Sequence, residues 1–283
     1  MVFGATGMAG HVMYLHLEST GKYSMSNVVF RTPLNHDSMI VDATDREAVV
    51  QVMKAVRPDV VINCIGVLVN DSKAHPDRAI FLNAYFPHLL KSLCLRYGAQ
   101  LIHISTDCVF SGKKGNYTET DFRDADDVYG RSKALGEIMD NSNLTIRTSI
   151  IGPELKAAGE GLFHWFMHQS GEIHGYKSAV WGGVTTLELA RAVEVAIDTG
   201  VSGLVQLSNG EGISKYDLLH LFRDIWRKED VSILPDNSCK LNKSIACSVK
   251  FGYKVPSYRE MLNNMAAWMK QHPELYEKNY PVR

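Results

Sequence analysis

The chain has 283 residues, and its 30 lysines and arginines balance 31 aspartates and glutamates, so the formal net charge is −1. This balance excludes a polybasic surface, and with it the electrostatic attraction that dominates non-specific nucleic-acid binding. Hydrophobic residues make up 45% and charged residues 22% of the chain, which is typical of a globular protein. No apolar run approaches the ~18 residues of a membrane span, and the N-terminus lacks a signal-peptide pattern. We therefore expect a soluble, cytoplasmic protein without nucleic-acid or membrane partners.

The cysteines and histidines give no disulfide or metal pattern. The five cysteines are odd in number and no pair has C-x-x-C spacing, which favours reduced thiols. His164 and His168 stand four residues apart and could share a helix face, but no third ligand accompanies them. We favour packing over metal binding for this pair and predict no metal site.

The chain opens with the pattern of a strand, a glycine-rich turn and a helix. Residues 1–3 are apolar but very short for a strand. Three glycines with G-x-x-G-x-x-G spacing come next, at Gly4, Gly7 and Gly10. Small residues here let the backbone approach a pyrophosphate, and the following helix supplies free N–H groups and the positive end of its dipole. We predict that this loop, Thr6 and Met8 included, binds a nucleotide; the alternative is a merely structural turn.

Short apolar segments then alternate with segments of helical length. The predicted strands are 28–30, 39–41, 60–62, 101–104 and 144–146, and the predicted helical segments are 45–56 and 76–97. Such alternation is typical of a parallel sheet with helices on both faces. Because parallel crossovers are right-handed, it favours the α/β class with a doubly wound, Rossmann-type sheet.

The pattern changes after Ile150, where glycines mark loops. Further helices are predicted at 162–169, 186–198, 215–227 and 258–270, and one more strand at 203–207. Ser214 and Ser257 are suitable N-caps for the last two helices. We expect residues 1–150 plus about 183–208 to form the cofactor-binding domain. Residues of about 151–182 and 209–283 would form a smaller, C-terminal substrate-binding lobe.

Several polar residues directly follow predicted strands, at the sheet edge where ligands of such folds bind. Arg31 follows the second strand; an arginine there suits a 2′-phosphate, whereas NAD-binding proteins carry an acidic residue. Arg31 therefore favours NADPH as the cofactor, with a solvated arginine as the alternative. The other residues expected to line the cofactor are Asp42, Ala43, Asn63, Cys64, Ile65 and Gly66.

Tyr129 and Lys133 form the most specific pair in the sequence. At i, i+4 on a helix their side chains share a face, and a nearby ammonium would lower the tyrosine pKa from its usual value of about 10. Tyr129 could then donate or accept a proton near neutral pH. Ser105 and Thr106 end the strand at 101–104, where a hydroxyl can donate a hydrogen bond to a substrate carbonyl oxygen.

With these motifs the sequence resembles the extended short-chain dehydrogenase/reductases, and within them the dTDP-4-dehydrorhamnose reductase family. The resemblance covers nearly the whole chain and is densest from 101 to 153. It rests on the glycine loop and on four further segments, S-T-D-C-V-F-S-G at 105–112, Y-T-E-T-D at 117–121, V-Y-G-R-S-K-A-L-G-E at 128–137 and I-R-T-S at 146–149.

The resemblance implies reduction, by NADPH, of the C4 ketone of a nucleotide-linked 4-keto-6-deoxy sugar in deoxysugar or surface polysaccharide biosynthesis. By position, Thr106, Tyr129 and Lys133 would be the catalytic residues. Tyr129, Lys133, Thr148 and Ser149 would also contact the nicotinamide half of the cofactor. The residues expected to contact the substrate are Thr106, Asp107, Cys108, Trp181, Gly183 and Thr185.

Two departures from the family bear on the substrate. Cys108 stands where the rhamnose enzymes carry a tyrosine that reaches the sugar, and the stretch 176–186 differs from the family's usual loop. The latter stretch is similar to that of relatives that reduce UDP-linked 2-acetamido-4-keto sugars, so the nucleotide of the substrate could be dTDP or UDP. Trp181, Trp165 and Phe166 could stack on its base, although core packing is the more common role for such aromatics.

Three other functions remain open. The chain could be a reductase of a UDP-linked 2-acetamido-4-keto-6-deoxy sugar, or a sugar-nucleotide 4-epimerase or dehydratase, which share the tyrosine and the lysine. It could also be a non-catalytic, NADP-binding regulatory subunit built on the same fold. A homodimer is the default expectation for the assembly.

Overall fold

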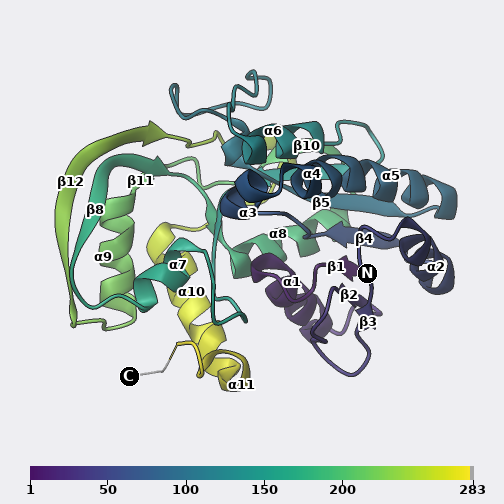
Figure 1. Cartoon of the computed structure of the whole chain (residues 1–283), viewed down its shortest axis with the longest axis horizontal. Coiled ribbons are helices and arrows are strands. Elements are labelled where there is room, and N and C mark those ends of the chain that lie inside the picture. Colours follow the sequence, from purple (N-terminus) through teal and green to yellow (C-terminus); the bar gives the residue numbers. More distant parts are fainter. Residues whose placement is uncertain (281–283) are drawn as a thin grey trace.

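The computed structural model describes residues 1–280, and a seven-stranded parallel sheet lies at its centre (Figure 1). The strand order is β10-β6-β5-β4-β1-β2-β3. The strands are β1 (Val2–Phe3), β2 (Asn27–Val29), β3 (Met39–Ile40), β4 (Val60–Asn63), β5 (Gln100–Thr106), β6 (Leu144–Thr148) and β10 (Gly203–Gln206). Because β1 has β2 on one side and β4 on the other, the chain winds outward in both directions from it. The predicted doubly wound sheet is confirmed.

Helices cover both faces of this sheet, and each face has its own hydrophobic core. On one face lie α1 (Met8–Ser19) and α8 (Thr186–Thr199), and α10 (Tyr258–Gln271) packs against α8. On the other face lie α2 (Arg46–Val56) and α5 (Phe86–Tyr97). Within residues 1–280, no helix combines the length and the apolar character needed to cross a bilayer.

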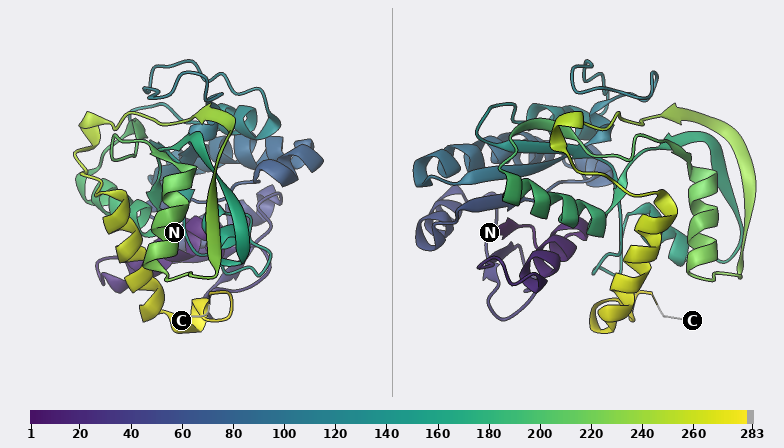
Figure 2. Two further views of the ribbon diagram at one scale, coloured as in Figure 1. Left: turned by 90° about the vertical axis from the view of Figure 1, so that its left-hand side faces the viewer. Right: turned by 180° about the vertical axis from the view of Figure 1, so that it is seen from behind.

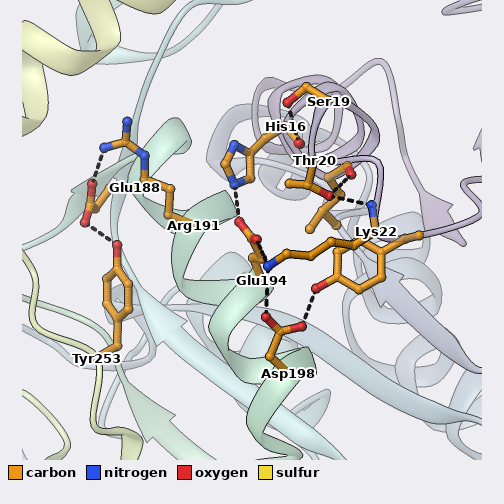
Figure 3. Close-up of polar contacts among 11 residues, drawn as sticks. His16, Ser19, Thr20, Lys22, Glu188, Arg191, Glu194, Asp198 and Tyr253 are labelled. Carbon is orange, nitrogen blue, oxygen red and sulfur yellow. Dashed lines mark hydrogen bonds and ion pairs between the residues drawn. The ribbon is translucent and has the colours of Figure 1, made fainter.

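Polar contacts attach α8 to the first strand–helix unit (Figure 3). Glu194 on α8 is hydrogen-bonded to His16 of α1 at 2.8 Å and to Lys22 at 2.6 Å. One turn further on, Asp198 accepts hydrogen bonds from Lys22 at 3.2 Å and from the Tyr23 hydroxyl at 2.6 Å. These contacts hold α8, a helix from the second half of the chain, against α1 on one face of the main sheet.

A buried ion pair joins β6 to the segment that follows α6 (Val128–Leu135). Arg147 donates to the Glu137 carboxylate from Nε at 2.9 Å and from Nη2 at 2.7 Å, and both side chains are almost fully buried. Arg123 and the Ser105 hydroxyl also donate to this carboxylate, at 3.0 and 2.8 Å. Because Ser105 lies near the end of β5, the network fixes the edge of the sheet where that strand stops.

A second, smaller sheet lies beside the main one, in the order β11-β8-β12 (Figure 2). It consists of β8 (Gly171–Trp181), β11 (Ile213–Ser214) and β12 (Val231–Asn242), and α9 (Lys215–Ile225) packs against β8. The remaining short elements are α3 (Val69–Ala74), α4 (Pro76–Ala79), β7 (Ile150–Ile151), α7 (Leu162–Met167), β9 (Val184–Thr185) and α11 (Pro273–Tyr276). The division into a cofactor-binding domain and a substrate-binding lobe, with boundaries at about residues 150, 183 and 208, stays a prediction.

Most predicted helices and strands are confirmed within a few residues, but the segment 76–97 is not one regular helix. It consists of α4, a π-helical stretch (Ile80–Tyr85) and α5. Pro87 has no N–H to donate to the carbonyl of Asn83, four residues earlier. That carbonyl instead faces Gly136, where an added Cβ would lie 1.9 Å from the oxygen. The π-helical stretch, whose turns are wider than those of an α-helix, therefore lies where the Asn83 carbonyl is packed against Gly136 at the end of α6.

The long strands β8 and β12 were not predicted, and β8 includes the first part of the stretch 176–186, up to Trp181. β8 contains two glycines and several charged residues, so its sequence lacks the apolar run of a buried strand. It is stabilised by parallel pairing with β12, about 60 residues away along the chain. Such pairing leaves no local signal in either segment.

The π-helical stretch has one fully buried polar residue, Asn83. Its side-chain oxygen accepts from the Val67 N–H at 2.8 Å, and its amide nitrogen donates to the Val67 carbonyl at 3.0 Å. The same nitrogen donates to the Ser132 hydroxyl on α6 at 3.1 Å. Asn83 therefore connects α6 to the segment that follows β4.

We expect Glu137→Gln to lower the free energy of unfolding by about 3–5 kcal/mol, because it leaves the buried Arg147 without its counter-ion. Urea denaturation measures this change. Arg259→Ala is the matched control, since Arg259 pairs with Asp224 on the surface at 3.6 Å, and exposed pairs contribute ~1 kcal/mol or less. Equal stability of Glu137→Gln and the wild type would contradict the role given to the buried pair.

We expect Asn83→Ala to lower the free energy of unfolding by about 1–3 kcal/mol, because the Val67 N–H and carbonyl lose their hydrogen-bond partners. Amide hydrogen exchange over residues 65–68 should also become faster than in the wild type. Ser92→Ala, which removes an exposed hydroxyl bonded to the His88 carbonyl on α5, is the control and should change neither quantity. Unchanged exchange over 65–68 would show that Asn83 does not hold this segment.

Candidate active site

A cleft of about 1170 Å³ runs along the carboxyl edge of the main sheet. It is lined by residues that follow β1, β2, β3, β4, β5 and β6, and by α6. The predicted site residues that line it are Gly4, Thr6, Gly7, Met8, Arg31, Asp42, Ala43, Cys64, Ile65, Gly66, Thr106, Cys108, Tyr129, Lys133, Thr148 and Ser149. The tertiary structure thus brings together most of the residues singled out in the sequence.

The glycine loop fits the phosphates of a dinucleotide. Gly4 has φ +78°, a conformation that favours glycine, and an added Cβ would lie 3.0 Å from the Ile65 side chain. Gly7 is the N-cap of α1, where no side chain caps the helix and no acidic residue occupies the first turn. The first N–H groups of α1 are therefore free to bind an anion at the cleft. Gly10 does not line the cleft; its Cβ would lie 2.1 Å from the Gly4 carbonyl oxygen, so it allows the turn to close.

Arg31 lies at the far end of the cleft from α6, directly after β2. It is exposed, and its guanidinium lies 4.4 Å from the centre of the Phe30 ring. This position leaves the guanidinium free to bind an anionic group. Asn63, which was expected to line the cofactor, is instead buried beneath the cleft. Its side-chain oxygen accepts from the Ile65 N–H at 3.1 Å, and so it supports a segment that does line the cleft.

Tyr129 and Lys133 both face the cleft from α6, as their spacing predicted. Asp127 caps this helix by accepting from the Gly130 N–H at 2.8 Å. An added Cβ on Gly130 would lie 2.3 Å from the Cys108 carbonyl oxygen, so the helix packs tightly on the turn after β5. This contact brings Tyr129 beside Thr106.

The pKa values of this pair differ from expectation. Burial raises the pKa of the Tyr129 phenol above its ordinary value, and a hydrogen bond with Thr106 opposes this shift without cancelling it. The predicted lowering by Lys133 is wrong: burial raises the pKa of Tyr129 most, and the acidic groups around the phenol raise it further. The Lys133 ammonium instead donates to the Ile104 carbonyl at 2.8 Å. Burial also lowers the pKa of Lys133 to about 8, against the opposing charge of Glu137.

Thr106 is at the end of β5 and directs its hydroxyl into the cleft. The hydroxyl donates to Asp107 at 3.2 Å and accepts from the Cys108 N–H at 3.1 Å. Asp107 itself is buried behind the cleft lining. Burial raises the pKa of its carboxyl, and the nearby Lys243 ammonium acts in the opposite direction. Asp107 can therefore orient Thr106, whereas Cys108 borders the cleft.

Ser149 receives support from residues that were expected to contact the substrate. The Trp181 indole N–H donates to the Ser149 hydroxyl at 2.9 Å, and Trp181 is buried at the end of β8. An added Cβ on Gly183 would lie 2.1 Å from the Ser149 carbonyl oxygen. Thr185 caps α8 by accepting from the Glu188 N–H at 3.2 Å. None of these three residues lines the cleft, and their contact with a substrate stays a prediction.

Two other sequence expectations concern the segment around α7. Phe166 lies in the core, and Trp165 is exposed away from the cleft lining. The rings of His164 and His168 stack at 4.3 Å, and His164 is hydrogen-bonded to the Tyr280 hydroxyl at 2.7 Å. Among residues 1–280 no group of three or more potential ligands could hold a metal ion.

The sequence analysis missed two sets of residues at the cleft. The first is Asn83, which is hydrogen-bonded to Val67, a residue that lines the cleft. Pro87, four residues after Asn83, was the available signal that this helix is irregular. The loop after β7 forms a wall, and its residues had no local pattern. The members of this wall that line the cleft are Glu154, Leu155, Lys156, Glu160 and Gly161.

The chain is similar to several known proteins, two of which are reductases. The dTDP-4-dehydrorhamnose reductase of Salmonella typhimurium is 28% identical over 249 residues, 82% of this chain and 80% of the relative. That of Aggregatibacter actinomycetemcomitans is 29% identical over 155 residues, so the chain spans about half the length of this relative in the match. Methionine adenosyltransferase 2 subunit beta of Rattus norvegicus is 30% identical over 138 residues, 48% of this chain and 41% of the relative.

The fold is that of a solved reductase. The crystal structure of dTDP-4-dehydrorhamnose reductase from Bacillus anthracis, in complex with NADP, has a TM-score of 0.81 at 22% identity and covers 94% of this chain and 98% of that chain. A family model described as the RmlD substrate binding domain matches residues 1–169, which is more than half of the chain. The protein therefore belongs to the RmlD substrate-binding domain family.

Proposed function

We propose that this protein is an NADPH-dependent reductase of the C4 ketone of a nucleotide-linked 4-keto-6-deoxyhexose, with dTDP or UDP as the nucleotide. The observation that carries the proposal is that one cleft holds both the glycine loop and, at its other end, Thr106, Tyr129 and Lys133. A product of this kind belongs to deoxysugar or surface polysaccharide biosynthesis. The similarity to reductases of the same family supports the reaction class.

The residues of the cleft suit the two ends of the cofactor. The free N–H groups at the start of α1 would bind its pyrophosphate, and Arg31 would pair with its 2′-phosphate. Lys133 would donate to the nicotinamide ribose, and the segment at Thr148 and Ser149 would border the nicotinamide ring. NADPH, when bound, supplies the hydride that reduces the ketone carbon.

The protein's own part in the reaction is to polarise the ketone oxygen and to protonate it. Thr106 donates a hydrogen bond to that oxygen, where negative charge develops, and to do so its hydroxyl hydrogen turns away from Asp107, its acceptor in this structure. Tyr129 then gives its proton to the same oxygen. The raised pKa of its phenol suits this direction, because the tyrosine holds its proton at neutral pH until the oxygen becomes basic.

The substrate end of the cleft differs from that of a rhamnose enzyme. The thiol of Cys108 cannot extend to the sugar as a tyrosine would, and burial raises its pKa to about 12, which keeps it neutral. The space left at this position suits a larger substituent on the sugar ring. A reductase of a UDP-linked 2-acetamido-4-keto-6-deoxy sugar is therefore the main alternative.

Two further functions share this site. A sugar-nucleotide 4-epimerase or dehydratase would use the same Tyr129 and Lys133, but Arg31 after β2 favours NADPH over a tightly held NAD. A non-catalytic regulatory subunit is supported by the similarity to methionine adenosyltransferase 2 subunit beta. The presence of all three proposed catalytic residues in one cleft favours the enzyme.

The deciding experiment is NADPH oxidation, followed by absorbance at 340 nm, with each substrate generated in situ. dTDP-4-dehydrorhamnose and the UDP-linked 2-acetamido-4-keto sugar are compared at equal concentration. Turnover of either substrate supports a reductase and identifies its nucleotide. Tight NADPH binding without turnover of either sugar would contradict the proposal and favour the regulatory function.

We expect Tyr129→Phe to lower kcat by about 10²-fold or more, the size of effect expected when a positioned general acid is lost. The affinity for NADPH should change little, because the phenol contributes little to the pyrophosphate end of the cleft. Tyr85→Phe is the control, since Tyr85 is a half-exposed tyrosine on the π-helical stretch. Wild-type turnover by Tyr129→Phe would exclude its role as the acid.

We expect Arg31→Ala to raise KM for NADPH by about tenfold while leaving KM for NADH nearly unchanged, because only NADPH carries the 2′-phosphate. Steady-state kinetics with each cofactor measure the ratio. Arg78→Ala removes another cleft arginine, one that pairs with Asp71 at 3.2 Å, and should affect both cofactors equally. An equal effect of Arg31→Ala on the two cofactors would remove the argument for NADPH.

A further inference from the structure

The segment 273–280 lies far from the proposed catalytic residues in sequence, yet it is hydrogen-bonded to the loop after β7 and, through His11, to the glycine loop, and both loops line the cleft. α11 carries Tyr276, and Asn279 and Tyr280 follow it directly. Tyr276 and Tyr280 are both buried. Neither tyrosine has a place in the chemistry proposed above, so their hydroxyl groups need another explanation.

The first contact is made through His11, a fully buried histidine one turn into α1. Its Nδ1 lies 2.8 Å from the Gly7 carbonyl oxygen, which can only accept, so Nδ1 carries the proton. Nε2 must then accept, and it lies 2.9 Å from the Tyr276 hydroxyl, the donor. The Tyr276 oxygen in turn accepts from the Trp268 indole N–H at 3.2 Å. Each donor in this series of hydrogen bonds, from Trp268 to Gly7, therefore has an acceptor.

This series of hydrogen bonds ends at the peptide group between Gly7 and Met8, which faces the proposed cofactor site. The Gly7 carbonyl and the Met8 N–H belong to one planar peptide unit and point in opposite directions. The Gly7 carbonyl accepts from the His11 ring at 2.8 Å and from the His11 backbone N–H at 3.2 Å, so the Met8 N–H points the opposite way, out of the N-terminal end of α1 where Gly7 and Met8 line the cleft. Burial lowers the pKa of His11 to about 4, so the imidazole stays neutral and keeps this arrangement at physiological pH.

The second contact is with the loop after β7, which lines the cleft next to the start of α1. The Tyr280 hydroxyl accepts from the Glu154 N–H at 2.8 Å. Asn279 donates from its side-chain amide to the carbonyls of Glu154 and Leu155, at 3.1 and 3.2 Å. Glu154 and Leu155 both line the cleft, and the Glu154 carboxylate accepts from the Gly161 N–H at 2.7 Å.

We propose that residues 273–280 form a clamp that sets the geometry of the cofactor cleft, with Tyr276 positioning the glycine loop through His11 and with Asn279 and Tyr280 positioning the loop at 154–161. The clamp residues are positioning residues and touch no reacting atom. The inference rests on the proposed function, since it assumes that NADPH occupies this cleft. Its consequence is that the C-terminal segment controls cofactor affinity and leaves the chemical step unaffected.

The test compares full-length wild type with Tyr276→Phe, which acts on the glycine loop, and with Asn279→Ala, which acts on the loop at 154–161. Fluorescence titration with NADPH gives the dissociation constant, and hydrogen exchange of the cofactor-free protein reports on residues 5–8 and 154–161. Tyr253→Phe is the control, because it removes a half-buried hydroxyl that donates to Glu188 outside the clamp. Thermal unfolding of each variant shows whether it is folded.

We expect each clamp variant to raise the NADPH dissociation constant about three- to tenfold, the range for one lost hydrogen bond, with kcat at saturating NADPH within twofold of wild type. Exchange should become faster over residues 5–8 in Tyr276→Phe and over 154–161 in Asn279→Ala. Unchanged affinity and exchange in both variants, or the same changes in Tyr253→Phe, would overturn the clamp. Failure of the wild type to bind NADPH would instead contradict the proposed function, and the exchange data would still test the clamp.

Discussion

The close approach of Gly10 to the Gly4 carbonyl is the contact on which the cleft depends. A Cβ at position 10 would lie 2.1 Å from that oxygen, so only glycine lets α1 begin this close to the end of β1. With the turn closed, the N-terminal end of α1 faces the carboxyl edge of the sheet, where β1 is the strand at which the order reverses. A helix end without a side-chain cap thus lies in the same cleft as the ends of β4, β5 and β6.

Burial is the main physical influence on the chemistry of the other end of the cleft. It raises the pKa of the Tyr129 phenol and lowers that of the Lys133 ammonium to about 8, because both charged forms are poorly solvated there. A tyrosine that keeps its proton suits the role of an acid in the direction of reduction. The lysine keeps most of its charge at neutral pH, and the nearby Glu137 carboxylate favours that charged form.

Much of the site is supported by residues that never line it. Asn83 holds Val67 beneath the cleft, Trp181 donates to Ser149, and Tyr276 reaches the Gly7 carbonyl through His11. Asn83 and Trp181 each make a hydrogen bond to a residue that lines the cleft, and Tyr276 does so through His11. Trp181 and Tyr276 come from the second half of the chain, so residues far along the sequence help to support a cleft whose predicted catalytic residues lie in the first half.

The sequence by itself determined the features that depend on neighbouring residues. The glycine spacing, the alternation of strands and helices, and the i, i+4 pair at Tyr129 and Lys133 predicted the doubly wound sheet and most of the cleft lining. The tertiary structure alone decided features that depend on distant contacts. These are the pairing of β8 with β12, the wider helical turn at Asn83, and the burial of Gly10, Asn63, Asp107, Trp181, Gly183 and Thr185 behind the cleft lining. It also reversed the expected pKa shift of Tyr129, because desolvation depends on everything packed around the phenol and not on the one lysine four residues away.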